Sequence, residues 1–156
     1  MNFFNELDKY DSNACLIDEN NKVFSYKEVL DIGKKTSKYL KERSLIFVLA
    51  QNHIEFVTSY VGFFAKGLVQ MLIDPKIEVN LFKNLVENYL PSYIFLPKLK
   101  KIDFKNYENF LDLKNHKILK IKKKVNYSIN MDLALMLSTS GSTGSKKFVR
   151  LSYENI

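Results

Sequence analysis

Apolar residues along the chain gather in short runs separated by amphipathic stretches. The run at residues 45–50 (LIFVLA) is apolar throughout, which is typical of a strand covered on both faces. Residues 68–73 and 92–97 form two further runs of strand length, while residues 52–66 and 81–90 carry apolar side chains at helical spacing. This order of strands and helices predicts an α/β fold with a largely parallel sheet and helices on both faces.

The region before the first buried strand predicts a hairpin and a helix. Two short β-rich runs within residues 14–24 flank Asn20-Asn21, and asparagine tolerates the positive φ of a tight hairpin turn. Ser25 is followed three residues later by Glu28, which predicts a capping box at the start of a helix.

A second helix start is predicted at Asn52 with Glu55, and a helix end at Lys66-Gly67. The most apolar window, residues 54–73, contains charged residues as well as glycine and serine. A buried helix followed by a strand explains this window better than a membrane span does.

Composition places the chain among ordinary globular proteins. The 156 residues suffice for one domain, with 46% hydrophobic and 26% charged residues. Cys15 is the single cysteine, so no internal disulfide forms. His53 and His116 lie far apart, and neither has neighbours at metal-ligand spacing, so no metal site is predicted. The N-terminus lacks the apolar segment of a signal peptide, and we expect a cytoplasmic protein.

The positive charge is concentrated in one lysine-rich segment, residues 98–124. Ten lysines there face three acidic residues, which accounts for the formal net charge of +7, because the rest of the chain has fourteen residues of each sign. We expect this segment to connect regular elements, with one exposed strand near its end at Ile118, Ile121 and Val125.

Residues 138–145 (STSGSTGS) follow an apolar run and precede two lysines and a second β-like run. Glycines leave backbone amides unobstructed, successive amides can form a concave anion nest, and hydroxyls and a lysine supply further donors. These features predict a cradle for phosphate groups. Its candidate binding residues are Thr139, Ser140, Gly141, Ser142, Thr143, Gly144 and Lys147.

Two common phosphate loops do not fit this stretch. Gly141 and Gly144 are three residues apart, where the Walker pattern needs five, and no Ser or Thr follows either lysine directly. The dinucleotide fingerprint requires three glycines, and only two are present. The residues after the lysines predict a strand, so no helix dipole would assist. The alternative without a binding function is a flexible Ser/Gly loop that joins two strands.

The stretch LSTSGSTGSKKFVRLSYENI resembles the phosphate-loop motif of adenylate-forming enzymes, which include acyl-CoA synthetases, nonribosomal peptide synthetase adenylation domains and luciferases. Residues 139–144 match the motif in place, Lys147 takes the lysine position, and Ser152 and Asn155 match the helix start that follows it.

The resemblance extends across some 130 residues. VFSYKEV is similar to an early family segment. In residues 45–75, the residues Asn52, Glu55, Gly67, Asp74 and Pro75 match a second, longer family pattern in order.

The resemblance implies an ATP-dependent ligase that activates a carboxylic acid as an acyl-adenylate and transfers it to a thiol of CoA or a carrier protein. ATP and Mg are the implied cofactors. The magnesium ligands and the catalytic lysine belong to later parts of such enzymes, so we expect residues 1–156 to be the N-terminal portion of an adenylation domain. We expect no catalytic residue in this chain, no activity from it alone, and self-association if core surface is exposed.

Two departures from the family motif are visible. Lys146 stands where proline is usual, and Phe148 stands where glycine is common. The first change removes a φ constraint and the second adds bulk beside the loop. They leave open which of Lys146 and Lys147 reaches the phosphate.

Two alternatives remain at this stage. The chain could be a non-catalytic truncated relative that keeps only a scaffold or partner surface. It could also be a binding module in which the lysines of residues 98–124 contact nucleic acid or an anionic membrane, with Phe104, Tyr107, Phe110 and Tyr127 between them. A solvated lysine face is the favoured interpretation of that segment, and no nucleic-acid partner is expected.

Overall fold

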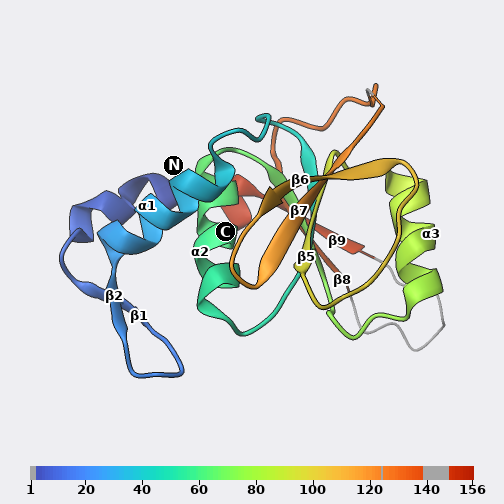
Figure 1. Ribbon diagram of the computed structural model, residues 1–156. Coiled ribbons are helices and arrows are strands. Elements are labelled where there is room, and N and C mark those ends of the chain that lie inside the picture. Colours follow the sequence, from blue (N-terminus) through green and yellow to red (C-terminus); the bar gives the residue numbers. More distant parts are fainter. Residues whose placement is uncertain (1–2, 124, 139–147) are drawn as a thin grey trace.

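The computed structural model describes residues 3–123, 125–138 and 148–156 (Figure 1). The helices are η1 (Phe3–Tyr10), α1 (Tyr26–Ser37), α2 (Ile54–Ala65), α3 (Val79–Tyr89) and η2 (Tyr153–Asn155), of which η1 and η2 are 3-10 helices. The strands are β1 (Ala14–Ile17), β2 (Val23–Ser25), β3 (Leu45–Leu49), β4 (Val69–Ile73), β5 (Tyr93–Pro97), β6 (Tyr107–Asp112), β7 (His116–Ile121), β8 (Leu133–Ser138) and β9 (Phe148–Ser152).

A seven-stranded sheet with the order β6-β7-β5-β3-β4-β8-β9 forms the centre of the molecule. The four inner strands β5, β3, β4 and β8 run parallel, and antiparallel strands flank them on both sides. The predicted α/β class, with a largely parallel sheet, is confirmed. The runs at residues 45–50, 68–73 and 92–97 became β3, β4 and β5, three of these inner strands.

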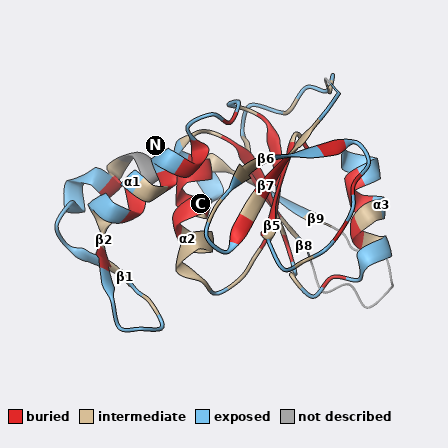
Figure 2. Ribbon diagram, viewed as in Figure 1, coloured by how far each residue is buried: buried red, intermediate tan, exposed pale blue. Residues whose placement is uncertain are grey.

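Helices cover both faces of this sheet, as predicted, with α2 and α3 on opposite sides (Figure 1). Alternate residues of a strand point to opposite faces. Phe47 of β3 therefore packs toward Phe82 of α3, with ring centroids 6.4 Å apart, while Phe95 of β5 packs toward Phe63 of α2 at 5.5 Å. The burial pattern shows the inner strands as the most deeply covered part of the chain (Figure 2).

The predicted hairpin and capping box are confirmed. Strands β1 and β2 pair antiparallel, and Asn21 adopts φ 60° in the turn between them. The Ser25 side chain accepts from the backbone amide of Glu28 at 3.2 Å, and the Glu28 carboxylate accepts from the Ser25 amide at 2.8 Å. This box starts α1, which packs on α2.

Close packing of α1 on α2 depends on two facing glycines. A Cβ at Gly62 would lie 2.2 Å from the backbone oxygen of Gly33, and one at Gly33 would lie 2.6 Å from the backbone oxygen of Thr58. Neither backbone oxygen can yield as a flexible side chain would. The two helices therefore approach more closely than any larger residue at either position permits.

The lysine-rich segment contains more structure than predicted. The strand expected at Ile118 and Ile121 is confirmed as β7, but it is not an exposed strand, because it pairs with β5 on one side and with the unpredicted β6 on the other. In β7, His116, Ile118 and Leu119 are buried, while Lys117 and Lys120 are half-buried. A lysine stem can lie along apolar surface while its amine stays in water. The lysines of β7 therefore made the segment look exposed in the sequence, although several of its residues belong to the core.

Burial of the aromatic residues counts against nucleic-acid stacking by this segment. Phe104 and Tyr107 belong to the core, and the Tyr107 hydroxyl donates to the Pro91 carbonyl at 2.7 Å. A base-stacking platform needs exposed aromatic faces. Of the four aromatics considered, Phe110 is half-buried and Tyr127 is 39% exposed.

Candidate functional site

Three parallel strands end at one edge of the sheet, called the carboxyl edge here. The register pairs Leu49 with Ile73 and Leu72 with Leu137, so β3, β4 and β8 finish side by side. The chain leaves β3 for α2 on one face and leaves β4 for α3 on the other. A reversal of this kind creates a crevice between neighbouring strand ends, where ligands of open α/β sheets bind.

A hollow of about 480 Å³ occupies this point. It is lined by residues 50–53, which follow β3, and by Pro75, which follows β4. Its volume is in the range of small-molecule sites.

The predicted phosphate loop, residues 138–147, starts at this edge. Thr139, Ser140, Gly141, Ser142, Thr143, Gly144 and Lys147 lie outside the described residues, as does Lys146. The described residues on either side are Ser138, which ends β8, and Phe148, which begins β9, and the two pair across the antiparallel ladder. The loop therefore begins and ends at the carboxyl edge, next to the end of β4.

Phe148 packs against α3, with its ring centroid 5.9 Å from that of Tyr89. The strand predicted after the loop is confirmed as β9. The helix start predicted at Ser152 and Asn155 is confirmed as η2, where the Ser152 hydroxyl donates to the Asn155 side-chain oxygen at 2.8 Å.

The turn after β4 is held by its own hydrogen bonds. The Asp74 carboxylate accepts from the Lys76 amide at 2.8 Å, and the Asp74 carbonyl accepts from the Ile77 amide at 3.0 Å. The Lys100 amine donates to the Pro75 carbonyl at 2.5 Å. Asp74 therefore acts as a turn residue, and its hydrogen bonds hold the turn that places Pro75 beside the hollow.

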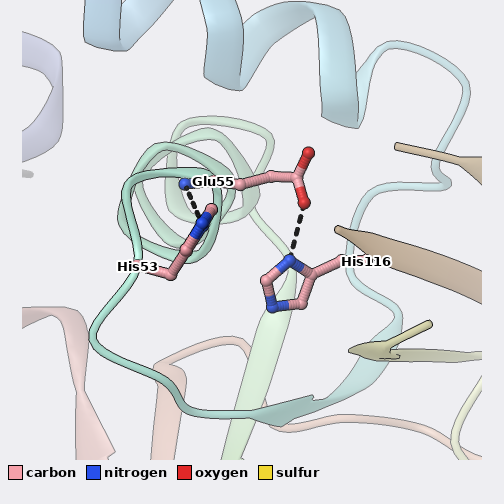
Figure 3. A group of neighbouring side chains, drawn as sticks. All are labelled: His53, Glu55 and His116. Carbon is pink, nitrogen blue, oxygen red and sulfur yellow. Dashed lines mark hydrogen bonds and ion pairs between the residues drawn. The ribbon is translucent and has the colours of Figure 1, made fainter. Parts of the chain in front are cut away.

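The start of α2 differs from the prediction. His53, rather than Asn52, is the N-cap, and its Nδ1 accepts from the Glu55 amide at 3.2 Å. Glu55 instead turns its carboxylate toward the β6–β7 turn (Figure 3). The expected pairing failed because histidine can cap a helix through a ring nitrogen, a use that the Asn52–Glu55 spacing does not reveal.

Glu55 and two histidines form a polar cluster, called the clamp, between α2 and the β6–β7 turn (Figure 3). The Glu55 carboxylate accepts from the backbone amides of Lys114 at 2.8 Å and Asn115 at 2.9 Å. It also accepts from Nδ1 of His116 at 2.6 Å. Nδ1 of His53 accepts from the Glu55 amide, and its Nε2 lies 3.0 Å from the side-chain nitrogen of Asn115.

The electrostatics of the clamp indicate an ionised carboxylate beside a neutral imidazole. Burial alone would raise the pKa of Glu55, but hydrogen bonds from His116 and the two amides together hold it below its usual value. Burial lowers the pKa of His116 despite its bond to Glu55. The His116 ring stacks on Phe95 at 4.6 Å, and its Nε2 has no hydrogen-bond partner in the described part of the chain.

The clamp brings together three residues of types that bind metals. Ligand atoms of His53, Glu55 and His116 lie within 4.8 Å of one another. However, both Glu55 oxygens and Nδ1 of both histidines already take part in hydrogen bonds within the protein. The arrangement therefore joins helix to hairpin, and sequence spacing gave no sign of it because 61 residues separate Glu55 from His116.

The family follows from a comparison with known sequences, in which the model of the family described as "AMP-binding enzyme" matches residues 3–156. The chain belongs to the AMP-binding enzyme family. This confirms the resemblance to adenylate-forming enzymes seen in the motif. No match was found among curated proteins.

Solved structures of adenylate-forming enzymes share the fold. Apo MatB from Rhodopseudomonas palustris has a TM-score of 0.72 and 16% identity, covering 99% of this chain and 35% of MatB. O-succinylbenzoate coenzyme A synthetase (MenE) from Bacillus subtilis, in complex with AMP, has a TM-score of 0.69 and 16% identity, covering 97% of this chain and 42% of that one. The NpsA N-terminal subdomain from Klebsiella oxytoca has a TM-score of 0.67 and 14% identity, covering 96% and 41%.

This member of the AMP-binding enzyme family thus spans less than half the length of these three structures. Within the residues that the structure describes, no helix is both long and apolar enough to cross a membrane.

Proposed function

We propose that the chain is the N-terminal part of an ATP-dependent ligase that activates a carboxylic acid as an acyl-adenylate. The acyl group would then pass to a thiol of CoA or of a carrier protein. Membership of the AMP-binding family supports the ligase class. Likeness to a CoA synthetase bound to AMP supports the nucleotide and the thiol acceptor. We expect this chemistry to take place in the cytoplasm.

The observation that carries the proposal is the position of Ser138 and Phe148 at the carboxyl edge. These two residues flank the Ser/Thr/Gly loop. Strand β8 ends beside β4, and the turn that follows β4 lines the hollow. A phosphate-binding loop starting here would hold its ligand where parallel α/β sheets hold theirs.

In this mechanism the loop residues bind and orient the β- and γ-phosphates of ATP. Amides of residues 139–144, the hydroxyls of Thr139, Ser140, Ser142 and Thr143, and the amine of Lys147 donate to phosphate oxygens. The substrate carboxylate attacks the α-phosphate, and pyrophosphate leaves from the side that the loop stabilises. Mg, when bound, would neutralise phosphate charge, and its protein ligands are expected outside this chain.

Substitution of the two adjacent lysines tests the proposal. We expect Lys147→Gln to weaken ATP binding by this chain about 10-fold or more, since a charge-assisted phosphate contact is lost. Lys146→Gln removes the same charge one residue away and should change affinity by less than about 3-fold. Isothermal titration calorimetry with ATP measures both. Equal affinities for wild type and Lys147→Gln would contradict the assignment.

The second part of the proposal is that these 156 residues do not catalyse adenylation alone. The assay is ATP–pyrophosphate exchange with the isolated chain and a panel of carboxylic acids. We expect no exchange above the rate without protein. Exchange that depends on an added acid would show that the chain itself holds a complete catalytic site.

A further inference from the structure

A second hollow lies at the opposite edge of the sheet, called the amino edge here, where β3 and β5 begin. Strand β7 runs antiparallel to β5 and ends there, since Lys120 pairs with Tyr93. The hollow has a volume of about 320 Å³. It is lined by residues 41, 43–44, 92–93, 120–123, 125 and 127.

The lining of this hollow is strongly cationic. Its charged side chains are Lys41, Arg43, Lys120, Lys122 and Lys123. None of the lining residues that the structure describes is acidic. Cations gathered in a concave site focus their field and attract anions.

Arg43 is held in place without a neutralising partner in the part of the chain that the structure describes. Its guanidinium donates to the carbonyls of Leu133 at 3.2 Å and Asn130 at 2.5 Å, and to the Tyr153 hydroxyl at 3.4 Å. Its backbone adopts φ 54°, and its Nε is buried with no hydrogen-bond partner in the described residues. A non-glycine residue held in this left-handed region marks a locally constrained position. Arg43 thus lines the hollow while its guanidinium is held by residues outside the lining, and no carboxylate among the described residues offsets its charge.

The lysines that line the hollow likewise have no carboxylate partner among the described residues. Lys120 lies over the Phe110 ring at 5.0 Å, and the Lys122 amine donates to the Lys105 carbonyl at 3.2 Å. The lysine ion pairs of the described chain involve other residues, as in Lys66 with Glu42 at 3.1 Å. Three lysines of the lysine-rich segment thus share the lining with Lys41 and Arg43, and no acidic side chain belongs to the described lining.

We propose that this hollow binds a small anion that carries more than one phosphate group. Cationic residues from two separate segments line one concavity of small-molecule size, whereas a macromolecular partner would require a wider surface. A single phosphate could not engage all these cations, while linked phosphates could. The site lies across the sheet from residues 138–147, so it stands independently of the proposed function.

Inorganic tripolyphosphate is the probe, measured by calorimetry at low salt on the full 156-residue chain carrying Lys147→Gln. This background weakens the contribution of the predicted loop. Adding Lys122→Gln with Lys123→Gln should reduce the remaining affinity at least 10-fold. Both lysines are exposed, so the fold should persist, and an unchanged circular dichroism melt verifies this. Lys41→Gln provides a second variant, from a different segment of the lining.

The matched control is Lys34→Gln with Lys35→Gln, two exposed lysines of α1 that remove the same charge. The proposal expects this control to change affinity less than 2-fold. Equal losses in control and pocket variants would mean attraction by net charge alone and would overturn the site. So would pocket variants that bind like the Lys147→Gln parent. A change caused by Lys147→Gln itself reports only on the loop, so the two proposals fail separately.

Discussion

The two edges of the sheet offer positive charge in different ways. At the carboxyl edge, the groups expected to meet an anion are backbone amides, hydroxyls and one lysine from a single stretch of chain, residues 138–147. At the amino edge, the cations are side chains from two segments that the fold brings together around one hollow. The first arrangement can be recognised as a sequence motif, whereas the second is visible only in the folded structure.

The edges also differ in how their charged groups are satisfied. The clamp lies at the carboxyl edge, where Glu55 is matched by two amides and His116. At the amino edge, the cations lining the hollow have no carboxylate partner among the described residues. A satisfied cluster stabilises a fold, whereas unbalanced like charges cost stability and favour a ligand. Substitutions in the clamp should therefore lower the stability of the fold, whereas substitutions in the hollow should be tolerated.

The largest expected effect is the loss of the clamp. Glu55→Ala leaves two amides and the His116 N–H without their acceptor, and should lower the free energy of unfolding by about 3 kcal/mol. Urea denaturation measures this. Glu42→Ala is the control, because Glu42 is 69% exposed and makes a single surface ion pair with Lys66, worth less than about 1 kcal/mol. Similar losses in the two variants would show that Glu55 is not a structural tie.

A smaller effect concerns acid sensitivity of the same edge. Burial lowers the pKa of His116 below its ordinary 6.5, so the unfolded chain takes up a proton before the native state does. Stability should therefore fall as pH drops below 6.5 toward the folded-state pKa. Glu55, whose pKa is also lowered, adds a further loss below 4.5. Thermal melts across this range should show wild type losing stability in both steps.

His116→Asn isolates the first step. The asparagine amide can take the place of Nδ1 as donor to Glu55 but does not titrate, so the loss below pH 6.5 should disappear. At neutral pH the variant should be about 1–2 kcal/mol less stable, because the ring stacked on Phe95 is gone. His53→Asn, an alternative N-cap, should keep the pH dependence. An unchanged slope in His116→Asn would assign the acid sensitivity to another group.

The smallest effect is expected at the amino edge. Lys122→Gln with Lys123→Gln relieves repulsion among unpaired cations and should raise stability by a few tenths of a kcal/mol at low salt. Lys34→Gln with Lys35→Gln should instead lower stability, since these lysines lie in the last turn of α1, where positive charge interacts favourably with the helix dipole. Both differences should vanish in about 0.5 M salt. Destabilisation by the Lys122 and Lys123 changes would mean that these charges are compensated.

The fold was largely predictable because its inner strands are local apolar runs. Residues 45–50 needed no partner information to indicate a doubly covered strand, and Ser25 with Glu28 fixed the start of α1 locally. Strand β7 was underestimated because its lysines masked buried positions on the other side of the strand. A pattern of lysines says how polar a segment is, but not which stem lies against the core.

Whether a candidate site could be proposed from the sequence likewise depends on how close its residues are along the chain. The Ser/Thr/Gly loop could be proposed from the sequence because its expected donors are consecutive, and it stays a prediction because residues 139–147 lie outside the described residues. The clamp and the amino-edge hollow could not, since each depends on contacts between residues tens of positions apart, such as Glu55 with His116 or Lys41 with Tyr93. Pairings at that distance are set by strand order, which local periodicity does not determine.

The central claim is that ATP binds at the carboxyl edge, at residues 138–147. Amide chemical-shift mapping of the isotope-labelled chain during an ATP titration tests it most directly. The account predicts the largest shifts at residues 138–148, with smaller ones at residues 50–53 and 74–77, and their reduction in Lys147→Gln. Shifts confined to the amino edge, or none at residues 138–148 at saturating ATP, would contradict it.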